Sequence, residues 1–119
     1  MKTPMEVLKA AAEIQQKKSN DYQNPNSRVK QAQYYPRGCS TISDIMFGKL
    51  LRIQSVLEAM ESDSKYEQNF ESLEDSAIDL INYATFFVSY LNGGISGQDP
   101  DRDFLNRVKE KTRSINVDE

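Results

Sequence analysis

Apolar residues recur every three or four positions in three long segments of the chain, which is the period of an amphipathic α-helix. In segment 69–91 the apolar stripe consists of Leu73, Ala77, Leu80, Ala84, Phe87 and Leu91. In segment 43–60 it consists of Met46, Leu50, Ile53, Leu57 and Met60. In segment 4–18 it consists of Val7, Leu8, Ala11 and Ile14. Valine and isoleucine fall within these helical periods and not in the alternating pattern of a strand, so the sequence predicts an all-α fold.

Residues that typically start or stop a helix lie at the ends of these segments. Thr3 and Glu6 have the spacing of a capping box for the first helix. Thr41 or Ser43 is expected to cap the second helix. The glycines of the sequence 92–94 are expected to end the third helix, because glycine readily adopts the left-handed conformation that closes a helix.

A fourth, shorter helix is expected from Asp99 to about Lys111, since an aspartate followed by Pro100 is a common helix start. Its apolar stripe is thin, so it is expected to dock loosely or on another subunit. The predicted architecture is a compact antiparallel bundle of three to four helices, with the second and third side by side. We expect one domain over residues 1–113 and a frayed tail at 114–119.

Residues 19–42 form the least regular part of the chain, and Asn20-Asp21-Tyr22 is expected to end the first helix. The aromatic and basic residues of this segment are Tyr22, Tyr34, Tyr35, Arg28, Lys30 and Arg37. Basic residues beside aromatic rings can hold a phosphate and stack a base. Equally, the tyrosines can cover the edge of the core, and the sequence leaves both interpretations open.

The third predicted helix also carries a second, polar stripe at positions i, i+4, i+8 and i+11, formed by Glu71, Asp75, Asp79 and Asn82. Carboxylates one turn apart repel each other, and a half-buried acid needs a partner. The natural partners are Mg²⁺, which binds carboxylate oxygens, or Arg and Lys from a facing helix. The stripe therefore predicts either a metal site or a cluster of ion pairs.

Lys49 and Arg52 are the cations best placed to meet these acids. They lie three residues apart on the second predicted helix, flanked by Ile45 and Val56. They are expected to clamp a phosphate or to form ion pairs with the acids, unless they merely extend to solvent from the border of a buried face.

Composition restricts the chemistry further. The chain has 119 residues, a net charge of −3, one cysteine and no histidine. The absence of a basic surplus argues against general nucleic-acid binding but not against a nucleotide ligand. No secretion signal and no run of about 18 apolar residues is found, so a cytoplasmic protein without a membrane span is expected. Without histidine, catalysis would rely on carboxylates, lysine, tyrosine or metal-bound water.

Magnesium-dependent cleavage of a nucleoside triphosphate is one reaction that these residues fit. Glu71, Asp75 and Asp79 would hold Mg²⁺ and act as the catalytic carboxylates, while Lys49 and Arg52 would neutralise charge on the phosphates. No covalent nucleophile is required for this reaction.

Three pieces of the chain, at residues 18–22, 43–52 and 70–84, resemble the nucleotide-modification-associated domain family of phages and bacteria. That family is similar to the MazG-like all-α NTP pyrophosphatases. The resemblance implies a compact helical fold, a homo-oligomer (dimer or higher) and a nucleotide ligand, in the host cytoplasm if the protein is phage-encoded. The matching candidates for nucleotide binding are Lys49, Arg52, Asn82, Tyr83, Asp21 and Tyr22.

The chain departs from the MazG-like pattern at one place. Such enzymes usually carry an acidic pair on the helix before the Glu-x-x-Asp helix, and Lys49-Leu50-Leu51-Arg52 stands there instead. Three interpretations follow: a metal site completed by Glu13 or Asp44, a protein that binds a nucleotide without cleaving it, or a purely structural set of ion pairs. The corresponding functions are a magnesium-dependent pyrophosphohydrolase and a non-catalytic protein that sequesters a nucleotide signal.

Overall fold

The computed structural model describes residues 2–22, 26–62 and 66–99, and within them the chain is all-helical. It contains α1 (Pro4–Tyr22), the 3₁₀-helix η1 (Gln31–Tyr34), α2 (Cys39–Ser62) and α3 (Tyr66–Leu91). The predicted all-α fold is thereby confirmed. The tail at 114–119 and the predicted fourth helix beyond Asp99 lie outside the described residues. None of the described helices has the length and apolar character needed to cross a membrane.

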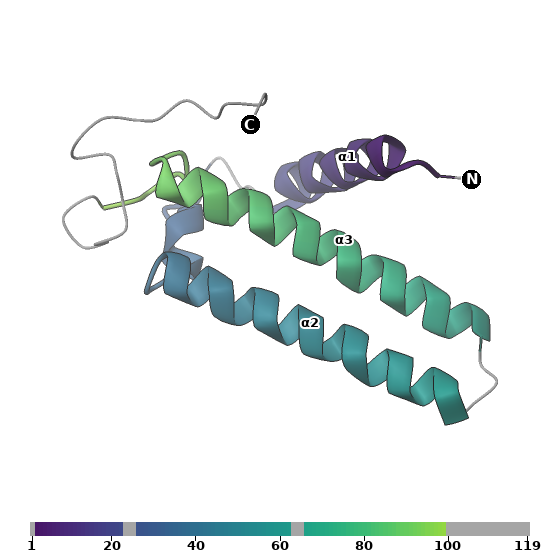
Figure 1. Ribbon diagram of the computed structural model, residues 1–119. Coiled ribbons are helices and arrows are strands. Elements are labelled where there is room, and N and C mark those ends of the chain that lie inside the picture. The colour runs from purple at the N-terminus through teal and green to yellow at the C-terminus, as the bar shows by residue number, and fades with distance from the viewer. Residues whose placement is uncertain (1, 23–25, 63–65, 100–119) are drawn as a thin grey trace.

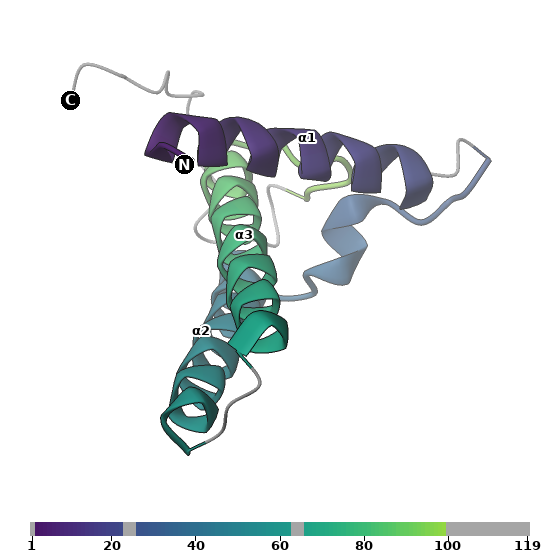
Figure 2. The ribbon, with the colours of Figure 1, turned by 90° about the vertical axis from the view of Figure 1, so that its right-hand side faces the viewer.

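The helices α2 and α3 lie side by side and antiparallel, as the sequence predicted, and form the body of the molecule (Figure 1). The helix α1 packs on α3 but lies across it and does not run along the pair (Figure 2). The crossing point is at Ala11, which is 1% exposed. The Asn82 side chain of α3 reaches the Ala11 backbone carbonyl there, with its Nδ2 donating at 3.1 Å.

The helices are longer than their sequence signals indicated. The helix α1 begins as predicted, with the Thr3 hydroxyl oxygen accepting from the Glu6 backbone N–H at 3.2 Å. Its predicted end at about Lys18 was too early, because the helix continues to Tyr22 and residues 20–22 belong to it. The helix α2 starts at Cys39, so Thr41 does not cap it; the Thr41 hydroxyl instead accepts from the Arg37 backbone N–H at 2.9 Å. Ser43 likewise lies inside the helix.

Glycines end α3 as predicted. The Gly94 backbone N–H donates to the Ser89 carbonyl at 2.8 Å, and Gly93 donates to the Tyr90 carbonyl with a φ of 76°. The chain then turns back so that the Ser96 carbonyl accepts from the Ala32 N–H at 3.0 Å. This bond ties the segment after α3 to η1.

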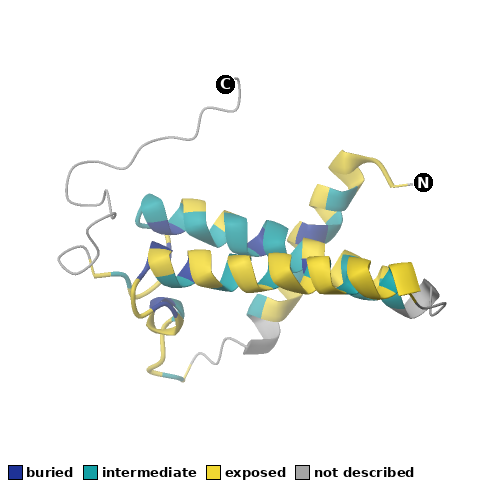
Figure 3. Ribbon diagram, turned by 60° about the horizontal axis from the view of Figure 1, so that its bottom comes forward, coloured by how far each residue is buried: buried dark blue, intermediate teal, exposed yellow. Residues whose placement is uncertain are grey.

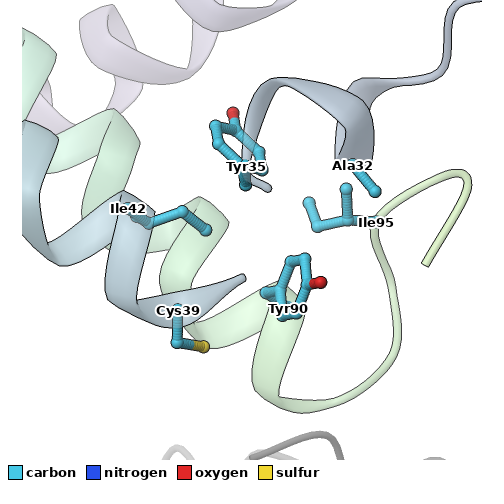
Figure 4. Packing of buried hydrophobic residues seen from close by; sticks show 6 residues of the cluster. All are labelled: Ala32, Tyr35, Cys39, Ile42, Tyr90 and Ile95. Carbon is cyan, nitrogen blue, oxygen red and sulfur yellow. The ribbon is translucent and has the colours of Figure 1, made fainter. Parts of the chain in front are cut away.

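The hydrophobic core lies at the end of the pair where α2 begins and α3 ends (Figure 4). Its buried members are Ala32, Tyr35, Cys39, Ile42, Tyr90 and Ile95. Tyr35 is 5% exposed, so for this tyrosine the interpretation as a cover for the core edge is confirmed. Tyr34, next to it, is 69% exposed.

Several residues that the periodicity placed inside are at the surface. Leu8, Leu50 and Leu57 are 50%, 41% and 48% exposed, so their assignment to the core was wrong. For Leu50 and Leu57 the cause is that α3 covers α2 along one side only, and this side is narrower than the apolar stripe of α2.

We expect Gly38→Ala to lower the free energy of unfolding by about 1–3 kcal/mol. Gly38 has a φ of 60°, and a Cβ built on it would lie 2.9 Å from the Tyr90 ring. The control is Gly48→Ala in α2, where nothing lies within 4 Å of the added Cβ. This control should gain about 0.5–1 kcal/mol from its better helix propensity. Urea unfolding measures both, and equal effects would contradict the close packing of Gly38 on Tyr90.

Candidate functional site

Polar side chains from all three α-helices meet on the side of α3 where α1 crosses it. We call this cluster the polar junction, and its members are Gln15, Lys18, Lys49, Asp79, Asn82 and Thr85. The first two come from α1, Lys49 comes from α2, and the last three come from α3.

Asn82 anchors α1 to α3 through both ends of its side-chain amide. Its Nδ2 donates to the Ala11 carbonyl at 3.1 Å, and its Oδ1 accepts from Gln15 Nε2 at 3.1 Å. The same Gln15 nitrogen donates to the Thr85 hydroxyl at 2.9 Å. Asn82 is 7% exposed, so an unpaired amide there would be costly, and these bonds satisfy it.

Asp79 forms ion pairs with two lysines, one from α1 and one from α2. Lys49 Nζ lies 3.1 Å from its Oδ2, and Lys18 Nζ lies 3.3 Å from its Oδ1. The Asp79 side chain is 25% exposed, compared with 32% for Lys49 and 54% for Lys18. The prediction that the acidic helix would pair with a cation of the preceding helix is therefore confirmed for Lys49 and Asp79.

The lysines set the acidity of this carboxyl. Partial burial by itself raises the pKa of Asp79, but hydrogen bonds and charge from Lys49 and Lys18 outweigh burial and hold the pKa below its ordinary value of 3.8. Asp79 is therefore ionised at neutral pH, and together with its two lysines it forms a group with one net positive charge.

The other acids of the stripe do not join Asp79. Glu71 and Asp75 are exposed, and no group of three or more His, Cys, Asp or Glu side chains suited to a metal ion occurs in residues 2–22, 26–62 and 66–99. Both Asp79 oxygens already accept from lysines. The described carboxylates thus do not make a complete Mg²⁺ site by themselves, since an all-protein site needs several converging oxygens.

The two residues considered as additional metal ligands lie elsewhere. Glu13 is exposed on α1. Asp44 is in the first turns of α2, where its Oδ2 accepts from Arg37 Nη2 at 3.0 Å. Asp44 also lines a shallow hollow near the start of α2, together with Cys39 and Phe87. Neither acid reaches Asp79 through any interaction found among the described residues.

The residues expected to bind nucleotide are divided between the junction and other places. Lys49 and Asn82 belong to the junction, whereas Tyr83 packs edge-to-face on Phe86 with ring centroids 5.5 Å apart. Arg52 is exposed and forms no ion pair within the described part of the chain. Asp21 and Tyr22 lie in the last turn of α1, and their side chains are outside the described residues.

Sequence reasoning missed Lys18, Gln15 and Thr85 as members of this cluster. Lys18 was noted only as part of the resemblance to the nucleotide-modification-associated family. Ala11, Gln15 and Lys18 are spaced i, i+4 and i+7, which places them on one face of α1. That spacing was the available signal, but it does not say which helix the face meets.

Comparison of the chain with protein-family models, with curated proteins and with solved structures finds no match in any of the three.

Replacing Asp79 by asparagine is expected to lower the free energy of unfolding by about 1–2 kcal/mol, because Lys18 and Lys49 lose their shared acceptor. The matched control is Asp75→Asn, one turn earlier on α3 and exposed. It should change stability by less than about 0.5 kcal/mol. Thermal or urea unfolding in a chelator compares them. A stabilised Asp79→Asn variant would mean that repulsion within the acidic stripe outweighs the lysine pairs.

The same ion pairs predict how stability depends on pH. The folded pKa of Asp79 is lowered, so the unfolded chain binds a proton more readily and acid favours unfolding. The contribution is complete above the ordinary value of 3.8 and disappears as the pH falls through the lower, folded pKa. The stability difference between wild type and Asp79→Asn should therefore be constant near neutrality and shrink below that value. A difference that grows in acid would refute the assignment.

Proposed function

We propose that the protein binds a nucleotide through its phosphate groups at the polar junction, with Lys18, Lys49 and Arg52 as the phosphate-binding residues. The observation that carries the proposal is the meeting of two lysines from different helices on one carboxylate, at 3.3 and 3.1 Å. One acid neutralises only one of the two charges.

The lysines have hydrogen-bonding capacity beyond Asp79. An ammonium group has three N–H donors, and Asp79 takes one from each lysine. Asp79 holds the two ammonium groups near each other, which reduces the cost of bringing them together around an anion. The Lys18 side chain is 54% exposed, so a phosphate can approach from solvent.

Arg52 extends the same basic surface. It lies one turn after Lys49 on α2 and is exposed. A guanidinium group can hold a phosphate with two parallel hydrogen bonds. The phosphate chemistry thus rests on these three cations, whereas the choice of a nucleotide rests on the resemblance to the nucleotide-modification-associated family, whose matching positions include Lys18, Lys49 and Arg52.

Magnesium-dependent cleavage of the bound triphosphate is the second candidate function. Glu71 and Asp75 favour it, because their exposed carboxylates precede Asp79 at one-turn intervals on α3. In such a reaction Mg²⁺ would supply charge neutralisation on the phosphates. Binding without cleavage is the simpler proposal, since Asp79 is already paired with lysines and the acids do not converge.

Binding is tested by titrating a panel of ribo- and deoxynucleoside triphosphates into the wild type, Lys18→Gln and Arg52→Gln by calorimetry, with and without Mg²⁺. Each substitution should weaken binding at least tenfold, about 1.4 kcal/mol, by removing a cation from the phosphates. The control is Lys17→Gln, an exposed lysine beside Lys18 that reaches no described acid. Arg52→Gln should not change thermal stability, because Arg52 has no ion pair in the described chain.

Two outcomes decide between the functions. Release of pyrophosphate with Mg²⁺, detected by product chromatography and lost in Asp75→Asn, would establish the hydrolase. Saturable binding without product would establish the non-catalytic binder. No binding of any nucleotide at millimolar concentration, or equal weakening in Lys17→Gln, would overturn the proposal.

A further inference from the structure

The helix α2 has an apolar face that no other described helix covers. We call it the outer face of α2, and it consists of Phe47, Leu50, Leu51, Gln54 and Leu57. Their spacing of i, i+3, i+4, i+7 and i+10 places them on one side of the helix. The four apolar members are 61%, 41%, 47% and 48% exposed, in chain order. Figure 3 shows exposed positions along most of α2.

This face is distinct from the one that binds α3. The side chains of α2 that turn inward include Ile42, which is fully buried, and Lys49, which reaches Asp79 on α3. The helix α1 packs on α3 and not along α2. Within residues 2–22, 26–62 and 66–99, therefore, no helix covers the outer face. Single apolar residues scattered over a surface are normal, whereas a contiguous apolar stripe such as this one indicates an interaction surface.

We propose that a second copy of this chain packs against the outer face of α2, with the two α2 helices antiparallel across a two-fold axis. A helical hairpin such as α2–α3 is half of a four-helix bundle, and two hairpins joined through their exposed stripes complete one. In this arrangement the Phe47 end of each stripe lies next to the Leu57 end of the other, and the leucines between them fill the middle.

The size of the face agrees with this occupant. Four large side chains that are about half exposed present on the order of 400 Å² of apolar surface. The smallest stable dimers bury roughly 600 Å² per partner, of which about 65% is apolar, which is again about 400 Å². The outer face thus supplies the apolar area that a small two-fold interface requires.

The polar member of the stripe also fits a second copy. Gln54 is exposed between Leu50 and Leu57 and carries both a donor and an acceptor on its side-chain amide. Two such amides from copies related by a two-fold axis can bond to each other. No lysine or arginine lies among these five positions, so no like cations meet when the face packs on itself. The exposed Glu58 lies on the same side of α2, at the Leu57 end of the stripe, so antiparallel packing places the two Glu58 carboxylates at opposite ends of the interface.

The test is the mass of the full chain by sedimentation equilibrium between 1 and 100 µM, as an order-of-magnitude range for weak dimers. The wild type should reach twice the 13.6 kDa of one chain. Leu51→Lys and Leu57→Lys should raise the dissociation constant roughly 30-fold or more, because each places a charge inside the interface. The matched control is Leu8→Lys on α1, since Leu8 is 50% exposed and Leu51 is 47% exposed.

Circular dichroism and urea unfolding confirm that each variant is folded. A wild type that stays monomeric at the highest concentration overturns the proposal. That outcome includes the case in which another part of the same chain covers the outer face. An assembly that survives both outer-face substitutions, or that Leu8→Lys disrupts equally, also overturns it. Nucleotide binding does not enter this measurement, so the outcome is independent of the proposed function.

Discussion

The carboxylate of Asp79 connects α1, α2 and α3 through ion pairs to two lysines. It belongs to α3, accepts from Lys49 of α2 at 3.1 Å and accepts from Lys18 of α1 at 3.3 Å. The helix α1 crosses α3, and among its described side chains, residues 4–19, only that of Ala11 is fully buried, so polar contacts contribute much of its attachment. The amide of Asn82, one turn further along α3, completes the attachment at the Ala11 carbonyl.

The apolar core joins α2, α3 and η1, whereas the polar junction attaches α1 to α3. At the start of α2, Gly38 lets the chain pass against the buried Tyr90 ring, and η1 and the segment after α3 close around it. Toward the middle of the α2–α3 pair, charged and amide groups hold α1 in place. A junction with partly exposed lysines is well suited to bind an anion, because its charges are already oriented but not fully desolvated.

The surface has two faces with different chemistry. The junction offers cations and hydrogen-bond donors, whereas the outer face of α2 offers apolar side chains at helical spacing. A ligand at the first and a second copy at the second would not compete for the same residues. The two proposals therefore assign separate roles to the two surfaces of α2, with Lys49 and Arg52 on one and Leu51 on the other.

The sequence by itself determined the three helices and the need of Asp79 for a cationic partner. The 3.6-residue period, the Thr3–Glu6 cap and the glycine stop after Leu91 are local features, so they predicted three helices correctly. The expectation that Asp79 needs a cation also followed from residue types alone. Local signals were less exact at two helix ends: α1 continues to Tyr22, and α2 already begins at Cys39, directly after Gly38.

Only the tertiary structure decided which faces meet. Periodicity shows that a helix has an apolar side, but not how much of that side another helix covers. Leu50 and Leu57 were therefore assigned to the core, although α3 packs on a different side of α2 and leaves them exposed. For the same reason the sequence did not identify Lys18 and Gln15 as neighbours of Asp79 and Asn82. They are more than 60 residues away along the chain, with sequence separations of 61 and 67, and the crossing of α1 over α3 alone brings them together.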